Sequence, residues 1–146
     1  MSMDQLIKSL GKKGVLKSVS IRDALKKVDR KDFVGEDLAS LVYEDTALPI
    51  GEGQTISQPY TVVFMLELLG AVSGEKIMDV GHGSGWSTGL LADIVGDGGK
   101  VYAIELLEIL CRMGEKNVSR YPDLRARVKF YCQNAEIGRA SCRERV

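Results

Sequence analysis

The amino-acid sequence predicts an α/β fold in which helices alternate with the strands of a parallel sheet. From residue 76 onward, short apolar runs of strand length alternate with longer segments of helical periodicity. The first of these runs ends in a glycine-rich loop, Gly81–Gly85, that leads directly into a helical segment. Consecutive strand–helix–strand units of this kind form parallel sheets with right-handed crossovers.

The N-terminal part of the chain is predicted to be helical. Apolar residues recur at helical spacing in two stretches, residues 3–10 and 20–28. Gly11 and Gly14 are expected to end the first helix. Residues 38–43 fit a short helix and a short strand equally well, so both interpretations stay open.

The segment of residues 48–60, LPIGEGQTISQPY, is predicted to be a loop that lines a ligand pocket. It holds two Gly, two Pro and a Gln-Thr-Ile-Ser-Gln run between apolar stretches, which is more hydrogen-bonding capacity than a plain turn needs. An apolar helix is predicted next, over residues 61–70, with Pro59 near its start and Gly70 at its end.

Three strands and two helices are predicted in the second half of the chain. The strands are residues 76–80, 101–104 and 128–132, and the first of them is short and apolar enough for a buried parallel strand. The helices are residues 86–94 and 107–117. Strand and helix thus alternate as an α/β domain requires.

Length and composition indicate one ordinary globular domain. The chain has 146 residues, which suits a single domain. Its 20 basic and 20 acidic residues cancel, so net charge gives no support for a nucleic-acid or anionic membrane partner. No apolar run approaches the roughly 20 residues that span a bilayer, and the N-terminus lacks the apolar core of a secretory signal. We therefore expect a cytoplasmic protein.

The cysteines and the single histidine argue against several kinds of site. Three cysteines without CxxC spacing indicate neither a disulfide framework nor a zinc site, which fits a reducing compartment. Cys111 lies among apolar residues of a predicted helix, as expected of a core residue rather than a nucleophile. His82 is the only histidine, so a multi-histidine metal site is not available.

The glycine loop and the acids around it indicate a nucleoside ligand. The dinucleotide fingerprint G-x-G-x-x-G needs a third glycine where this chain has Trp86, so the pattern is G-x-G-x-G instead. Glu105 ends the next strand, where a carboxylate can accept hydrogen bonds from ribose hydroxyls. Asp79 adds negative charge, which suits a cation such as a sulfonium better than a pyrophosphate. We expect this loop and residues 48–60 to form two walls of one pocket; a tight turn without a ligand is the alternative.

These segments together resemble the protein-L-isoaspartate O-methyltransferases, a family of class I S-adenosylmethionine-dependent enzymes. The matching stretches are Tyr43–Asp45 followed by LPIGEGQTISQPY, the helix VVFMLELL, the loop MDVGHGSGWSTGLLA and the strand VYAIE. The resemblance covers residues 4–138. It implies a Rossmann-like class I methyltransferase fold, with a doubly wound, mainly parallel sheet that is incomplete at its C-terminal half and is preceded by helices.

The resemblance also implies a set of residues that bind S-adenosyl-L-methionine. Ser57 matches the active-site serine of the family, and Glu105 would bind the ribose. Asn134 and Ala135 stand where the family has an Asp-Gly pair that contacts adenine, so this sequence departs from the family pattern there. His82 replaces a small residue of the usual loop. The full implied set is Gln54, Thr55, Ile56, Ser57, Asp79, Gly81, Gly83, Ser84, Gly85, Glu105, Asn134 and Ala135.

The implied reaction is methyl transfer to the carboxylate of L-isoaspartyl residues in damaged proteins and peptides, with D-aspartyl residues as an additional acceptor, and it initiates repair. A carboxylate with a pKa near ~4 is ionised at neutral pH, so the enzyme has mainly to align the reacting atoms. Ser57 would orient that carboxylate, or it would cap the helix that follows, and both roles can coexist. Transfer to another acceptor and cofactor binding without catalysis are the alternatives.

The C-terminal end of the chain departs from the family pattern. Residues 1–136 are expected to be the N-terminal part of one methyltransferase domain, with a helical segment over 1–45 and the cofactor-binding part over 46–136. Residues 137–146 are expected to be a non-native tail, and the later strands of the family do not follow. We therefore expect this polypeptide to fold poorly and to be nearly inactive, whereas its full-length parent would be a monomeric enzyme without nucleic-acid or membrane partners.

Overall fold

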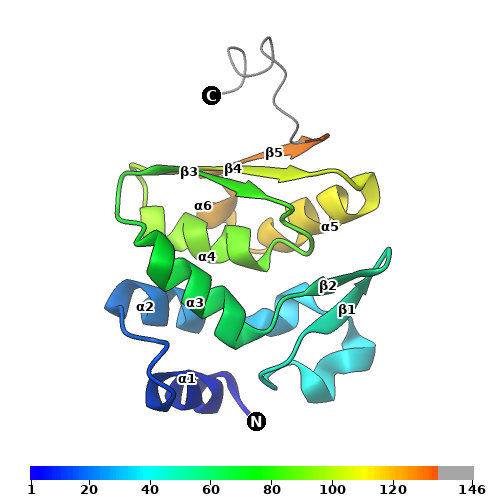
Figure 1. Cartoon of the computed structure of the whole chain (residues 1–146). Coiled ribbons are helices and arrows are strands. Elements are labelled where there is room, and N and C mark those ends of the chain that lie inside the picture. The colour runs from blue at the N-terminus through cyan, green and yellow to red at the C-terminus, as the bar shows by residue number, and fades with distance from the viewer. Residues whose placement is uncertain (135–146) are drawn as a thin grey trace.

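The computed structural model describes residues 1–134 of the chain (Figure 1). In chain order, the elements are α1 (Met3–Lys12), α2 (Val19–Lys27), the 3₁₀ helices η1 (Arg30–Phe33) and η2 (Glu36–Leu41), β1 (Leu48–Gly51), β2 (Gln54–Ile56), α3 (Pro59–Leu69), β3 (Lys76–Val80), α4 (Trp86–Val95), β4 (Lys100–Glu105), α5 (Glu108–Val118), α6 (Pro122–Arg125) and β5 (Val128–Cys132). The expected tail, residues 137–146, lies outside the described residues.

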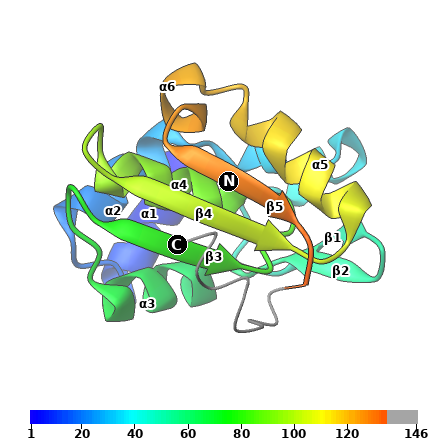
Figure 2. The same ribbon diagram turned by 90° about the horizontal axis from the view of Figure 1, so that it is seen from above.

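A parallel sheet of the three strands β3, β4 and β5, in that order, forms the centre of the α/β part (Figure 2). The helices α4, α5 and α6 pack beneath one face of the sheet, and α1, α2 and α3 form a further layer below them (Figure 1). Within residues 1–134, no helix lies on the other face of the sheet. Strand, helix and strand alternate as predicted, so the α/β prediction is confirmed.

The hydrophobic core lies between the sheet and these helices. Its fully buried side chains come from both parts of the chain, among them Leu10, Leu25, Trp86, Leu90 and Val101. Each such aliphatic side chain contributes about 1.5–3 kcal/mol when it leaves water. The N-terminal helices therefore belong to the same hydrophobic core as the sheet.

The structure replaces part of the predicted loop at residues 48–60 with a β-hairpin. Strands β1 and β2 pair antiparallel, with Leu48 opposite Ile56, and both of these side chains are buried. Gly51, Glu52 and Gly53 all have positive φ, which closes the tight turn between the strands. The glycines were interpreted as loop residues, whereas they are the turn of a hairpin. Residues 38–43, left open above, contain the end of the 3₁₀ helix η2.

Several predicted boundaries shift by a turn or less. Helix α1 continues through Gly11 to Lys12, and α3 begins at Pro59 because proline fits the first turn of a helix. Gly70 ends α3 in the left-handed conformation, as expected. The three strands begin and end within one residue of their predicted limits.

Strand β3 is parallel, as predicted, but the prediction that it is buried is wrong. Met78 and Val80 are 42% and 57% exposed. These side chains stand on the sheet face that no described helix covers, and β3 is also an edge of the three-stranded sheet. The strand is apolar, as its sequence shows, but Met78 and Val80 stay exposed because no described helix packs on their side of the sheet.

The prediction that no cysteines pair is also wrong. Cys111 of α5 and Cys132 of β5 form a disulfide. A helix and the strand after it bring together two cysteines that are 21 residues apart, and sequence spacing alone does not reveal this contact. Cys111 is fully buried, as expected of a core residue. Among residues 1–134, no group of three or more His, Cys, Asp or Glu could hold a metal ion, and no helix is long and apolar enough to cross a membrane.

Candidate functional site

The glycine loop turns the chain from β3 into α4 at the carboxyl end of the sheet. The amides of Gly81 and His82 both donate to the carbonyl of Ile104 in β4, at 2.7 and 3.2 Å. Gly81 has a φ of +75°, and a Cβ added there would meet no atom within 4 Å. The backbone at Gly81 is therefore open to direct approach by a ligand.

Gly85 serves a different purpose at the other end of the loop. Its φ is +91°, and a Cβ there would come within 2.9 Å of the Gly114 carbonyl oxygen in α5. Asn117 of the same helix donates to the carbonyl of Ser84 at 3.0 Å. The second half of the loop is therefore packed tightly against α5.

The hydroxyl-rich segment and the glycine loop share one pocket, as predicted. The pocket has a volume of about 70 Å³. It is lined by Thr55, Ile56, Ser57 and Val62 on one side and by Gly81, His82, Gly83, Ser84, Trp86 and Ser87 on the other. Pockets that enclose a drug-sized ligand measure about 300–1,000 Å³. The enclosed space is therefore smaller than a ligand of that size.

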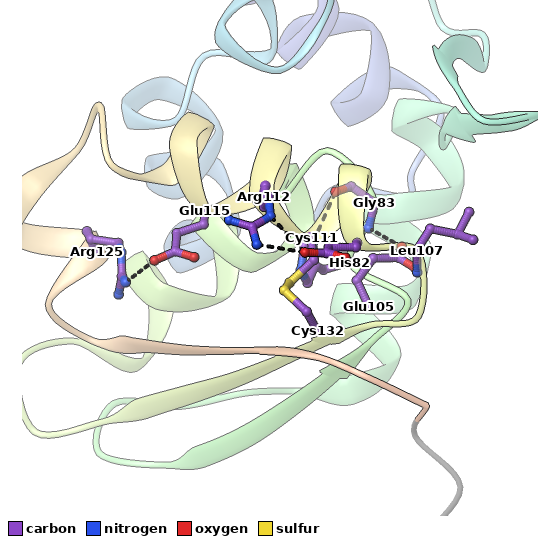
Figure 3. Close-up of a disulfide and its surroundings, with 10 residues drawn as sticks. His82, Gly83, Glu105, Leu107, Cys111, Arg112, Glu115, Arg125 and Cys132 are labelled. Atoms are coloured by element: carbon purple, nitrogen blue, oxygen red, sulfur yellow. Dashed lines mark hydrogen bonds and ion pairs between the residues drawn. A yellow bond between two sulfur atoms is a disulfide. The ribbon is translucent and has the colours of Figure 1, made fainter.

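Glu105 lies beside this pocket and is almost fully buried. Its carboxylate accepts the amide of Gly83 at 3.1 Å and the amide of Leu107 at 3.0 Å, one on each oxygen (Figure 3). A carboxylate has about four acceptor positions, so two remain for the hydroxyls of a ribose. The residue thus fixes the glycine loop and can bind a ligand with the same group.

Asp79, expected to contact a ligand, has a structural role in the loop. One of its oxygens, Oδ2, accepts the hydroxyls of Ser87 at 2.8 Å and Thr88 at 2.7 Å. These two residues lie in the first turn of α4, so Asp79 ties the end of β3 to the start of the helix. The sequence pattern showed the acid but did not reveal these two hydroxyl partners.

The side chain of Ser57 is exposed at the mouth of the pocket. The residue at the N-cap of α3 is Gln58, so the structure does not realise the helix-capping alternative for Ser57. Thr55 and Ile56 line the same pocket, whereas Gln54 lies on β2 outside it. Asn134 is exposed just after β5, and Ala135 lies outside the described residues.

Arg30 is a functional candidate that the sequence did not identify. It is fully buried, and its guanidinium donates to the backbone carbonyls of Val42, Glu44, Thr46 and Ser57, at 2.8–3.2 Å. The guanidinium also lies over the ring of Trp86, 5.4 Å from its centroid. Burial lowers the pKa of Arg30 to about 10 while Asp45 opposes the shift, so the side chain remains charged at neutral pH.

Because of these contacts, Arg30 connects the two walls of the pocket. It holds the backbone of Ser57 on one wall and packs on Trp86, the first helical residue after the glycine loop, on the other. In the sequence, Arg30 stands in the charged run Asp29–Asp32 and resembles an ordinary surface residue. No periodic signal marks it as buried.

His82, a residue of the glycine loop, is buried. Its Nδ1 lies 3.0 Å from the carbonyl oxygen of Gly83, and its ring meets Phe130 edge-on at 5.2 Å. Burial lowers the pKa of His82, although Asp79 and Glu105 nearby oppose the shift. The imidazole is therefore neutral at physiological pH and packs between the loop, β5 and α5.

Solved structures with the same fold identify the class to which this architecture belongs. A structure of a protein-L-isoaspartate O-methyltransferase matches 90% of this chain and 42% of its own, with a TM-score of 0.80 and 29% sequence identity. A crystal structure described as such an enzyme from Plasmodium falciparum, in complex with S-adenosyl-L-homocysteine, matches 99% of this chain and 69% of its own, with a TM-score of 0.88 and 24% identity. The fold is the Rossmann-like fold of class I S-adenosylmethionine-dependent methyltransferases, seen here in part.

Sequence comparison then gives the family. The model of the protein-L-isoaspartate(D-aspartate) O-methyltransferase family matches residues 1–141, and the chain belongs to this family. The protein-L-isoaspartate O-methyltransferase of Aeropyrum pernix is 40% identical over 80% of this chain and 45% of its own length. That of Ignicoccus hospitalis is 40% identical over 78% of this chain and 54% of its own length. The chain thus spans about half the length of the curated relatives it matches.

Proposed function

We propose that this chain is part of an enzyme that transfers a methyl group from S-adenosyl-L-methionine to the carboxylate of L-isoaspartyl residues in damaged proteins. The family description also includes D-aspartate, so D-aspartyl residues belong to the proposal. One observation carries the proposal beyond family membership. The segment that contains Ser57 and the glycine loop at Gly81 line one pocket at the carboxyl ends of parallel strands, where α/β proteins bind their ligands.

The residues at this site fit the proposed cofactor. Gly81 leaves open space for close approach, Glu105 keeps acceptor positions for a ribose, and the hydroxyl-bearing wall of Thr55 and Ser57 faces the loop. In this proposal, Asp79, Gly81, Gly83, Ser84 and Gly85 hold the methionine end of the cofactor. Gln54, Thr55, Ile56 and Ser57 form the opposite wall, Glu105 binds the ribose, and Asn134 and Ala135 lie toward the adenine.

S-adenosyl-L-methionine supplies an electrophilic methyl group on a sulfonium. The chain's own residues have to place a carboxylate in line with it, because an acceptor carboxylate is ionised at neutral pH and needs no general base. Ser57 is placed to orient that carboxylate with its exposed hydroxyl. Arg30 fixes the backbone carbonyl of the same residue, and so keeps the hydroxyl at the mouth of the pocket.

The proposal extends to the organisation of the whole protein. Residues 1–136 would be the N-terminal part of a single domain, with residues 1–45 as a helical segment and 46–136 as the cofactor-binding part. The enzyme would act as a monomer in the cytoplasm, on protein and peptide substrates, without nucleic-acid or membrane partners. Because this chain spans about half the length of its relatives, we expect the 146-residue polypeptide alone to be nearly inactive.

A methyl-transfer assay tests this function. Residues 1–134, joined to the C-terminal half of the Ignicoccus hospitalis relative, should transfer radiolabelled methyl groups to an isoaspartyl peptide but not to the same peptide with a normal aspartyl residue. Replacing Ser57 with Ala should lower the rate by about 10-fold or more, in line with the loss of a positioning group. Equal transfer to both peptides would favour a different acceptor and refute the proposal.

Cofactor binding without turnover is the second candidate for the chain alone. Two observations favour it: no described helix covers one face of the sheet, and the chain spans only about half the length of its relatives. It predicts that the 146-residue chain binds S-adenosyl-L-homocysteine in calorimetry but transfers no methyl group to any carboxylate. Turnover by the isolated chain at the rate of the chimera would refute it.

A further inference from the structure

The disulfide between α5 and β5 stands directly beside the candidate ribose site (Figure 3). Cys111 is fully buried in α5, and Cys132 is the exposed last residue of β5. Their Cα atoms are 5.5 Å apart, a common separation for bridged cysteines. One sulfur is therefore accessible to thiols in solution, while the other is shielded.

Glu105 is linked to both sides of this bridge by short chains of contacts. In the sheet, Cys132 is the register partner of Glu105, and the next residue, Gln133, donates its amide to the Glu105 carbonyl at 2.9 Å. On the helix side, Cys111 donates its amide to the Leu107 carbonyl at 2.9 Å, and the Leu107 amide donates to Glu105 Oε2 at 3.0 Å. Glu105 is thus connected to Cys132 through the sheet and to Cys111 through Leu107, and the disulfide joins these two connections covalently.

We propose that Cys111 and Cys132 form a reversible redox site that sets how tightly the chain binds the ribose of the proposed cofactor. This inference rests on the proposed function, in which Glu105 receives the ribose hydroxyls. In the oxidised form, the start of α5 and the end of β5 are held together, so the Glu105 carboxylate is preorganised. In the reduced form, the covalent link between the two elements is lost, and the same hydrogen bonds must hold Glu105 without it.

The chemistry is a thiol–disulfide exchange. A thiolate of a dithiol reductant attacks the exposed sulfur of Cys132, and the sulfur of Cys111 leaves as a thiolate that takes up a proton. The second thiol of the reductant then attacks the mixed disulfide, releases Cys132 as a thiol and closes the reductant into a cyclic disulfide. Two electrons and two protons thus pass from the dithiol to the cysteine pair, and a disulfide such as oxidised glutathione reverses the reaction.

The test uses the full 146-residue chain with Cys142→Ser, so that only two cysteines remain. Peptide mapping by mass spectrometry after air oxidation should find Cys111 linked to Cys132. Calorimetry with S-adenosyl-L-homocysteine should show an affinity about 3- to 10-fold lower after dithiothreitol treatment and buffer exchange under argon, as expected when one restraint on a preorganised site is lost. The ligand-free chain should also melt about 5 to 10 °C lower when reduced.

A matched variant separates the redox effect from other effects of the reductant. Cys132→Ser in the Cys142→Ser background should bind like the reduced form and should not respond to dithiothreitol. A missing cross-link after oxidation would overturn the cysteine pair itself. A cross-link with equal affinity in both redox states would overturn only its coupling to Glu105. If a linked, folded chain bound no ligand in either state, the cofactor site of the proposed function would fall, and the coupling with it.

Discussion

Arg30 is a buried charge whose two terminal nitrogens donate to backbone carbonyls before β1 and after β2, while its Nε has no partner among the described residues. Its guanidinium serves four carbonyls at once, including that of Ser57. A lysine at this position would keep the charge but lose the planar fork of donors. We therefore expect Arg30→Lys to lower the free energy of unfolding by about 1–3 kcal/mol, the usual cost of leaving a buried hydrogen-bonding group without its partner.

Urea denaturation followed by Trp86 fluorescence measures this change, since Trp86 is the only tryptophan and lies under Arg30. Arg112→Lys is the matched control, because Arg112 is exposed and pairs with Glu108 one turn earlier in its helix. The free energy of unfolding of the Arg112→Lys variant should hardly change. If the two variants were equally stable, the contacts of Arg30 would not be what holds the Ser57 segment in place.

The buried His82 makes the stability of the fold depend on pH. Because burial lowers its pKa in the folded state, the unfolded chain binds a proton first as the pH falls below about 6.5. The contribution of His82 to stability is thus complete above that pH and is lost as the pH falls toward the lower, folded pKa. The slope for one proton is at most about 1.4 kcal/mol per pH unit.

Chemical denaturation between pH 8 and pH 5 tests this dependence. His82 is the only histidine, so His82→Ala should remove the loss of stability between pH 6.5 and 5 that the original chain shows. The original chain and His82→Ala are compared by the slope of the free energy of unfolding against pH, so a difference in their absolute stabilities does not matter. Parallel slopes in this range would show that His82 titrates normally and is not buried as described.

At the residue scale, what could be predicted depended on chemical type and position in a motif. Gly81 and Glu105 stand at the ends of apolar strands, where a ligand site is expected, and the structure places them there. The hydroxyl partners of Asp79 could not be predicted, because they depend on how α4 leaves the loop. Arg30 could not be predicted either, since its charged neighbours in the sequence resemble a solvated turn.

Within the loop element, the two terminal glycines should respond differently to substitution. Both have positive φ, so alanine at either position should lower the free energy of unfolding by about 1–2 kcal/mol. Gly85→Ala should lower it by about a further 1–3 kcal/mol, because its Cβ would meet the Gly114 carbonyl oxygen and the Val118 side chain. Gly81→Ala should instead weaken cofactor binding, because its Cβ would occupy open space at the site.

Each variant is therefore measured twice, by urea denaturation and by calorimetry with S-adenosyl-L-homocysteine. We expect Gly85→Ala to lower the free energy of unfolding more than Gly81→Ala does. We expect Gly81→Ala to lower the affinity for S-adenosyl-L-homocysteine more, relative to its loss of stability. The opposite order would mean that the ligand does not approach the loop at Gly81.

The outer face of α3 and the strand β3 both leave apolar surface exposed. Phe64, Met65, Leu68, Met78 and Val80 on these two elements are each more than 40% exposed. An uncovered strand edge and an apolar helix face favour association. We therefore expect the 146-residue chain alone to self-associate. The monomeric state proposed above is that of the whole enzyme, in which further chain would cover this surface.

Size-exclusion chromatography with light scattering tests the association. The double substitution Phe64→Lys and Leu68→Lys should shift the chain toward a monomer. Ile109→Lys is the matched control, because Ile109 is similarly exposed but lies on α5. If Ile109→Lys shifted the chain toward a monomer equally well, then added charge, and not the α3 face, would govern the association.

At the element scale, the prediction of strands and helices was accurate where periodicity was strong. The strands over 76–80 and 128–132 are confirmed at both ends. The hairpin at Leu48–Ile56 was missed because one proline and two glycines masked two short strands. The burial of β3 was wrong because a composition rule for parallel strands assumes helices on both faces, and the described helices cover only one.

At the scale of the whole molecule, the carboxyl ends of the three parallel strands bring distant parts of the sequence to one site. The glycine loop follows β3, Glu105 ends β4, and Cys132 ends β5. The hairpin and the N-terminal helices complete the site from the other side, through Ser57 and Arg30. The N-terminal segment therefore shares the core of the sheet and supports one wall of the candidate site.

The proposed function requires that one methyl donor be held between the Ser57 segment and the glycine loop. A crystal structure of the chain with S-adenosyl-L-homocysteine would show whether it is. We expect the ligand to contact both Thr55–Ser57 and Gly81–Ser84, with its ribose hydroxyls on the carboxylate of Glu105. A ligand held by only one of these segments, or bound elsewhere with Glu105 untouched, would refute the shared site.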